Sequence, residues 1–181
     1  MTRKLFYTWV LGAVACLAAE AQTLTVGSYN IRYKNRNDSI AGNAWIDRYP
    51  SICKQIRWER PDIFGAQEVL DGQLKDLEAN LPEYKWIGVG RDDGKKKGEY
   101  AAIFYAPQRI ALLEEGHFWL NETPDRPALG WDAACIRICT WGHFRDLQSG
   151  QDFYFLNLHM DHVGVKARSE SAKLVMRSEE H

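Results

Sequence analysis

The sequence predicts a layered α/β fold in one domain. Its 181 residues are 45% hydrophobic and 26% charged, an ordinary globular composition that excludes disordered, collagen-like and coiled-coil chains. Strand and helix patterns alternate in the first half, an order that favours helices packed on a sheet. The second half contains a series of strand-like runs, so β structure dominates toward the C-terminus.

The first strand and helix follow from short, well-bounded patterns. Residues 24–33 (LTVGSYNIRY) are rich in β-forming types and end at a polar stretch, residues 34–43. Apolar residues then recur at helical spacing over residues 49–56, with Pro50 in a first-turn position where it is tolerated. Pro61 ends this helix.

The remaining elements continue this order. A short strand at residues 62–67 leads into leucines 70, 74, 77 and 81, which recur at helical spacing up to Pro82. A turn containing Ser149-Gly150 joins the last two strands as a hairpin, and a final helix is expected at residues 166–180. The predicted later strands are residues 86–89, 101–105, 110–120, 134–144 and 152–159.

The first 21 residues have the pattern of a secretory signal peptide. Arg3 and Lys4 precede an apolar run, and Ala19-Glu20-Ala21 supplies the small residues of a cleavage site. The run of about 15 apolar residues is too short to span a bilayer, so no transmembrane span is predicted. We therefore expect a domain at residues 22–181 that is secreted or periplasmic, with lipid attachment at Cys16 as a weaker alternative.

Export permits disulfides, but the cysteine pattern does not favour one. Residues 22–181 keep Cys53, Cys135 and Cys139. The last two lie on one predicted strand, about 13 Å apart, whereas a disulfide needs less than about 7 Å. We expect three buried free thiols, and pairing with another chain remains open.

The net charge of −1 provides no overall positive field, so phosphate recognition must be local. One local cluster is Lys95, Lys96 and Lys97, between two glycines. It is interpreted as a solvated loop tip or, alternatively, as a rim that attracts phosphate.

Polar side chains with useful chemistry follow three predicted strands. Asn30 ends the first strand, Glu68 ends the second, and His159 ends the last. Each residue also has an ordinary structural interpretation. Asn30 suits a turn cap, Glu68 a solvated acid at a helix start, and His159 a core histidine. Together they provide a carboxylate for a hard metal ion, an amide and an imidazole, which suits metal-assisted hydrolysis of a phosphoester.

In their order, the motifs SYNIR, GAQEV, GEYAAIFY and NLHMDH resemble the endonuclease/exonuclease/phosphatase superfamily, which includes pancreatic deoxyribonuclease. The resemblance covers residues 24–176. It implies a metal-dependent phosphoric ester hydrolase, a nuclease or phosphatase, built as a four-layer α/β/β/α sandwich. This chain is expected to supply the N-terminal part, with one sheet largely present and the second incomplete.

The resemblance also implies roles for particular residues. Glu68 matches the ligand of Mg²⁺ (or Mn²⁺), Asn30 matches an amide that contacts metal-bound water or phosphate, and His159 matches a histidine that binds the scissile phosphate or leaving group. Arg137 occupies a phosphate-contacting position, although an ion pair at a sheet edge is an equally good interpretation. Further substrate-binding or rim candidates are Asp161, His162, Arg168 and, as an orienting group, Glu99.

The substrate stays open: nucleic acid, an inositol phosphate, a phospholipid head group and a small phosphoester all fit, and no obligate protein partner is predicted. Two segments that complete the family's site, Gly-Asp-x-Asn and Ser-Asp-His, do not occur in this sequence. We therefore expect a domain truncated at its C-terminus and inactive as it stands. The inner face of its sheet, including Ile138 and Phe155, would lack a partner layer.

Two alternatives come from other classes of protein. Trp119 and Trp131 flank a polar loop, residues 121–130, which suits an exported, non-catalytic binding protein on the same scaffold. Asn157-x-His159-x-Asp161-His162 differs by one residue from the zinc motif of metallo-β-lactamase-fold hydrolases. An amide in the first position is a poor zinc ligand, which weakens that alternative.

Overall fold

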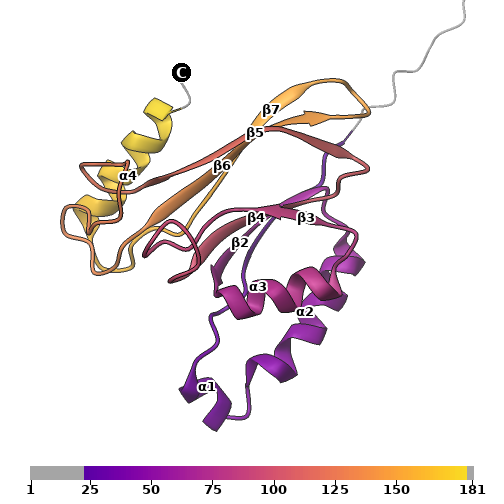
Figure 1. The fold of residues 1–181 in the computed structure, drawn as a ribbon, viewed down its shortest axis with the longest axis horizontal. Helices are drawn as coiled ribbons and strands as arrows, with labels where there is room; N and C mark the ends of the chain where they lie inside the picture. The colour runs from indigo at the N-terminus through magenta and orange to yellow at the C-terminus, as the bar shows by residue number, and fades with distance from the viewer. Residues whose placement is uncertain (1–22, 179–181) are drawn as a thin grey trace, which may run out of the picture.

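The computed structural model describes residues 23–178, which form two β-sheets packed face to face (Figure 1). The larger sheet has the strand order β1-β2-β4-β3, and the smaller sheet has the order β5-β6-β7. Helices α2 and α3 cover the outer side of the larger sheet (Figure 1). The predicted α/β class with two sheets is confirmed, whereas the predicted signal peptide lies outside the described residues.

Eleven elements make up the described part of the chain. The larger sheet and its helices comprise β1 (Val26–Asn30), α1 (Arg36–Ile40), α2 (Trp45–Glu59), β2 (Ile63–Val69), α3 (Asp71–Asn80), β3 (Lys85–Ile87) and β4 (Tyr100–Tyr105). The smaller sheet and the last helix comprise β5 (Ile110–Trp119), β6 (Ile138–Asp146), β7 (Asp152–Leu158) and α4 (Val165–Ser178).

Helix α2 forms where the apolar spacing predicts it, and it ends for a local reason. Its buried face includes Ile52 and Ile56. The helix begins at Trp45, so Pro50 is its sixth residue and the predicted first-turn position of Pro50 is wrong. Arg60 then adopts a left-handed conformation, with φ 47°, immediately before Pro61. A residue before proline is disfavoured in the α region, so the helix cannot continue.

A core between the two sheets corrects one expectation. Phe144 of β6 is fully buried together with Ile63 and Ile103 of the larger sheet, and Phe155 of β7 packs against this cluster. Ile138 is also buried. The inner face expected to lack a partner layer is therefore covered, because β5, β6 and β7 form a sheet of their own that packs against the larger one.

A second correction concerns the strand predicted at residues 134–144, which begins only at Ile138. The preceding segment is a loop, because the backbone N–H groups of Ala134 and Cys135 donate to the Asp161 carboxylate at 3.2 Å. Cys53 and Cys139 are buried and free as predicted. Cys135 is free but only partly buried, since it lies in this loop.

In the part of the chain that the structure describes, no helix combines the length and apolar character needed to cross a bilayer.

Replacing Phe144 by Ala tests the packing between the sheets. Its ring contacts Tyr105 and Phe153, so truncation leaves a cavity in the inter-sheet core. We expect a loss of about 3–5 kcal/mol in the free energy of unfolding, measured with urea. As a control, Leu147→Ala at a half-exposed position should change stability by less than about 0.5 kcal/mol. Equal effects of the two substitutions would contradict the packing.

Candidate active site

The ends of β1 and β2 place Asn30 beside Glu68. These strands are parallel, and Asn30 is aligned with Gln67, the residue before Glu68. The Asn30 amide nitrogen Nδ2 donates to Glu68 Oε1 at 2.8 Å, and the Tyr33 backbone N–H donates to Oε2 at 3.1 Å. The exit of the first strand therefore orients the carboxylate of the second.

The backbone of Glu68 has an unusual conformation. Its φ of 61° is left-handed, and the pairing of β2 with β4 shifts register between Ala66 and Val69. A non-glycine residue in this region costs on the order of 1–3 kcal/mol, and such residues concentrate at functional sites. A bulge at the end of a strand also re-aims a side chain. Here it presents Glu68 to a pocket.

This pocket brings together four of the residues singled out from the sequence, which are Glu68, Glu99, Arg137 and His159. Asn30 joins them through its hydrogen bond to Glu68. The remaining lining residues are Arg91, Tyr100, Ala101 and Ile138.

His159 is half-buried, and its Nδ1 atom is buried without a hydrogen-bond partner in the described structure. Burial lowers the pKa of its imidazole below the ordinary value of 6.5, and the positive charge of Arg137 lowers it further. Glu68 and Glu99 act in the opposite direction but do not reverse the shift. A neutral imidazole at pH 7 can donate or accept a hydrogen bond, and the free nitrogen requires a water or ligand partner.

Arg91 is a pocket residue that sequence reasoning missed. Its Nη1 donates to Glu99 Oε2 at 2.8 Å, so the two form an ion pair in the pocket wall. The indole N–H of buried Trp119 donates to the Arg91 carbonyl at 2.7 Å. Trp119 thus anchors a loop, which disfavours the interpretation that it grips a ligand. No sequence motif marks Arg91, because its role depends on this long-range packing.

Gln73 is a second residue that sequence reasoning missed. It is buried in α3, and its Oε1 accepts the backbone N–H groups of Lys34 at 2.9 Å and Leu70 at 3.3 Å. Its Nε2 donates to the Arg32 carbonyl at 3.1 Å. One amide therefore ties together the chain segments that follow Asn30 and Glu68.

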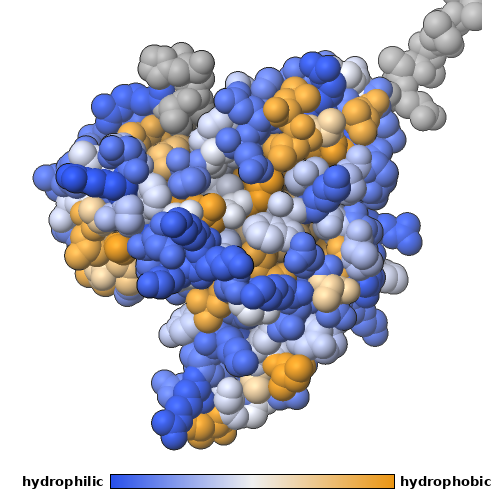
Figure 2. Space-filling view, viewed as in Figure 1, coloured by the Kyte–Doolittle hydropathy of each residue, from blue (hydrophilic) through white to orange (hydrophobic). Residues whose placement is uncertain are grey.

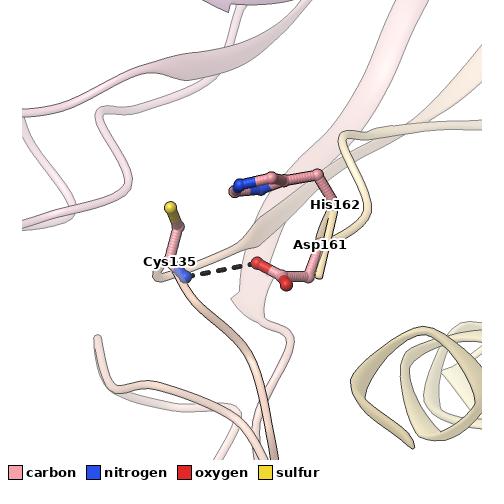
Figure 3. Close-up of side chains that lie close together, drawn as sticks. All are labelled: Cys135, Asp161 and His162. Carbon is pink, nitrogen blue, oxygen red and sulfur yellow. Dashed lines mark hydrogen bonds between the residues drawn. The ribbon is translucent and has the colours of Figure 1, made fainter. Parts of the chain in front are cut away.

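Asp161 lies beside Arg137 but is buried, with its Oδ2 atom 3.4 Å from the guanidinium Nε. Burial alone would raise the pKa of its carboxyl, but backbone N–H groups, led by those of Gly164 and Ala134, more than compensate and lower it. The carboxylate holds two loops in place through these N–H groups. Figure 3 shows its hydrogen bond with the backbone N–H of Cys135. Its predicted contact with substrate stays a prediction, and these bonds favour a positioning role.

His162 is exposed, and its Nδ1 lies 3.2 Å from Arg137 Nη2. The possible ligand atoms of Cys135, Asp161 and His162 lie within 4.8 Å of one another (Figure 3). The Asp161 carboxylate already accepts four backbone N–H groups and has the Arg137 guanidinium at 3.4 Å, whereas each Glu68 oxygen accepts one N–H group. This cluster therefore fits a metal ion less well than Glu68 does.

The zinc motif of the metallo-β-lactamase alternative does not converge. The Asn157 amide is buried and donates to the backbone carbonyls of Ala66 and Ala102. His159 does not join Asp161 and His162 in the ligand cluster found within the described residues. The structure does not support this alternative.

Lys95, Lys96 and Lys97 occupy an exposed turn in the loop between β3 and β4, where Figure 2 shows strongly hydrophilic residues. Asp93 Oδ1 accepts the backbone N–H groups of Lys95 and Lys97, which fixes the turn. The base of the same loop supplies Arg91 and Glu99 to the pocket. The geometry suits both interpretations, a solvated tip and a phosphate-attracting rim.

The donor set fits a hard divalent ion. Mg²⁺ is usually held by one or two carboxylates together with waters and substrate oxygens, because it dehydrates reluctantly. Glu68 supplies one carboxylate, and each of its oxygens keeps a lone pair beyond the N–H group it accepts. Glu99 lies in the same pocket but is paired with Arg91.

The chain is similar to solved structures of the endonuclease/exonuclease/phosphatase family. A mannosyl-6-phosphatase from Bacteroides thetaiotaomicron is 53% identical, with a TM-score of 0.85 over 87% of this chain and 59% of its own. A family protein of the same organism is 54% identical, with a TM-score of 0.85 over 87% of this chain and 58% of its own. The predicted resemblance and its fold are confirmed.

Among curated proteins, an uncharacterised protein of Acanthamoeba polyphaga mimivirus is 30% identical over 138 residues, which are 72% of this chain and 51% of that protein. No family model matches the sequence. The chain thus spans about half the length of this relative and 58–59% of the two Bacteroides structures.

The titration of His159 tests the convergence of the site. We expect its pKa, followed by NMR of the ring protons, to lie below 6.5 and to fall further in Glu68→Gln, because the carboxylate favours the imidazolium. Glu78→Gln, at an exposed position on α3, should leave it unchanged. An unaltered pKa in Glu68→Gln would show that the two groups lie too far apart to interact.

The same shift has a consequence for stability. Because the pKa is lower in the folded state than in the unfolded chain, protonation of His159 favours unfolding. Its contribution to stability is therefore present above pH 6.5 and is lost as the pH falls through the folded pKa.

Proposed function

We propose that this protein is a Mg²⁺-dependent phosphoesterase that hydrolyses a phosphomonoester on a sugar. The observation that carries the proposal is the pocket that joins Glu68, Arg137 and His159 at the ends of strands from both sheets. The choice of a sugar phosphate is supported by the 53% identity to a mannosyl-6-phosphatase. A phosphodiester or nucleic acid is an outcome that the substrate panel below distinguishes.

In this proposal each pocket residue has a separate task. Glu68 would hold Mg²⁺, which when bound neutralises phosphate charge and acts as a Lewis acid. Asn30 holds the Glu68 carboxylate in position through its 2.8 Å hydrogen bond. Neutral His159 donates a hydrogen bond to a phosphate oxygen or to the leaving oxygen.

Arg137 supplies positive charge at the pocket wall. It is buried and has Asp161 and His162 as neighbours, which restrict its guanidinium to one orientation. A fixed guanidinium presents its N–H groups to a phosphate without a further loss of side-chain freedom. In this proposal Arg137 can therefore have both of the roles predicted from the sequence, an ion pair and a phosphate contact.

The family's Gly-Asp-x-Asn and Ser-Asp-His groups, to which the resemblance assigns the attacking water and base chemistry, do not occur in the 181 residues. We propose that the present chain carries the half of the site that binds the cation and the phosphate. Positioned acid–base groups contribute about 10²–10⁴-fold to rate. The chain alone should therefore turn over slowly.

Phosphate release tests both parts of this proposal. With mannose 6-phosphate and Mg²⁺, we expect the 181-residue chain to be at least about 100-fold slower than the Bacteroides mannosyl-6-phosphatase. The residual rate should disappear with EDTA and in Glu68→Gln, but persist in Glu78→Gln. A panel with bis(p-nitrophenyl) phosphate and single-stranded DNA identifies the preferred ester. A rate unaffected by EDTA would contradict the proposed chemistry, and equal rates for the two enzymes would contradict the half-site.

We also propose that the protein is exported, since residues 1–21 have a secretory pattern. Expressed with its own N-terminus in a Gram-negative host, the protein should be found in the periplasm or medium with Gln22 as its first residue. The intact mass and the N-terminal peptide of the fractionated protein, measured by mass spectrometry, check this. A cytoplasmic product that begins at Met1 would contradict export.

A further inference from the structure

A buried pair of amide side chains connects the two sheets, on the same strands that lead to the pocket residues Glu68 and His159. Gln67 of β2 donates from Nε2 to Oδ1 of Asn157, on β7, at 2.7 Å. Both side chains are more than nine-tenths buried, and the residues lie 90 positions apart in the sequence. A hydrogen bond in such surroundings is stronger than one in water, and leaving either amide unpaired is costly.

The Asn157 amide has no unused group. Its Nδ2 donates to the Ala66 carbonyl at 3.0 Å and to the Ala102 carbonyl at 2.8 Å. These residues face each other on β2 and β4 at the position after which the pairing shifts register. Asn157 therefore fixes the larger sheet at the point where the bulge begins.

A close approach of backbone and side chain makes this arrangement possible. A Cβ atom at Gly65 would lie 2.5 Å from Asn157 Oδ1 and 2.6 Å from its Cγ atom, distances that real side chains do not tolerate. Only glycine at this position leaves room for the amide. The glycine at position 65 is therefore required for the contact between Asn157 and β2.

The position of the pair along the two strands relates it to the pocket. Gln67 immediately precedes Glu68, and Asn157 lies two residues before His159, a spacing that puts side chains on the same face of an extended chain. The 2.7 Å bond therefore limits how far the Glu68 segment can move relative to the His159 segment. Neither Gln67 nor Asn157 lines the pocket itself.

We propose that Gln67 and Asn157 are positioning residues that fix the end of β2. They would thereby set the orientation of the Glu68 carboxylate, on which the affinity for the divalent cation depends, and its distance from His159. The inference rests on the proposed function, because it assigns the pair to that cation site. Outer groups that orient a metal ligand typically contribute 10–100-fold to metal affinity.

The test measures Mn²⁺ binding by the full chain and the broadening of the His159 ring signals by bound Mn²⁺. The broadening depends steeply on the distance between the ion and the ring, so a purely structural role of the amides would not change it. In Gln67→Met we expect affinity to fall about tenfold and the broadening at saturation to decrease. Asn157→Leu should have a larger effect, and if it fails to fold, Gln67→Met carries the test.

A matched control exists in another buried amide. Asn121, in the loop after β5, is 2% exposed and makes hydrogen bonds to Thr123, Arg126 and Ala128. Asn121→Leu should lower the urea midpoint but leave Mn²⁺ affinity and the His159 broadening unchanged.

The outcomes separate the two claims. If the wild-type chain binds Mn²⁺ and Gln67→Met binds it equally well, with the same broadening, the positioning role is wrong and the proposed function stands. If the wild-type chain binds no Mn²⁺, or if Glu68→Gln binds as tightly as wild type, the proposed function fails and the positioning role fails with it.

Discussion

The buried amide of Asn157 is the contact on which the arrangement of the two sheets and the pocket depends. An amide placed between sheets is unfavourable unless all of its groups are bonded, and here the two backbone carbonyls and the Gln67 side chain satisfy it. Apolar packing between the sheets, as around Phe144, is strong but tolerates small displacements. The directed bonds of Asn157 do not, and they therefore select one register between β7 and the larger sheet.

The pocket depends on this register, and its wall carries charged side chains of both signs. Glu68 faces the pocket from the larger sheet, Arg137 comes from the segment before β6, and Arg91 and Glu99 form an ion pair in the same wall. The wall therefore contains two carboxylates and two guanidinium groups, which leaves no large excess of either sign. A cation with a bound phosphate is suited to such a balance, whereas either ion alone meets both attraction and repulsion.

Much of the fold and part of the site were accessible from the sequence. The helix containing Ile52 and Ile56 and the strand ends at Asn30, Glu68 and His159 follow from local periodicity and from the tendency of polar groups to gather at strand exits. The motif order also predicts the two-sheet class.

What the sequence could not reveal is the part that depends on distant partners. The Gln67–Asn157 bond joins residues 90 positions apart, and Asn157 was considered only as a weak zinc ligand. Asp161 shortens the predicted strand by drawing Ala134 and Cys135 into a loop, which no local pattern indicates. The second sheet covers the inner face of the larger sheet through three-dimensional packing, which sequence periodicity alone does not specify.

The most direct test of the account is a crystal structure of the chain soaked with Mn²⁺ and phosphate, with the metal located by its anomalous scattering. The account predicts an ion about 2.1 Å from a Glu68 carboxylate oxygen, with the phosphate beside His159. An ion bound instead among Cys135, Asp161 and His162, with the Glu68 pocket empty, would contradict it.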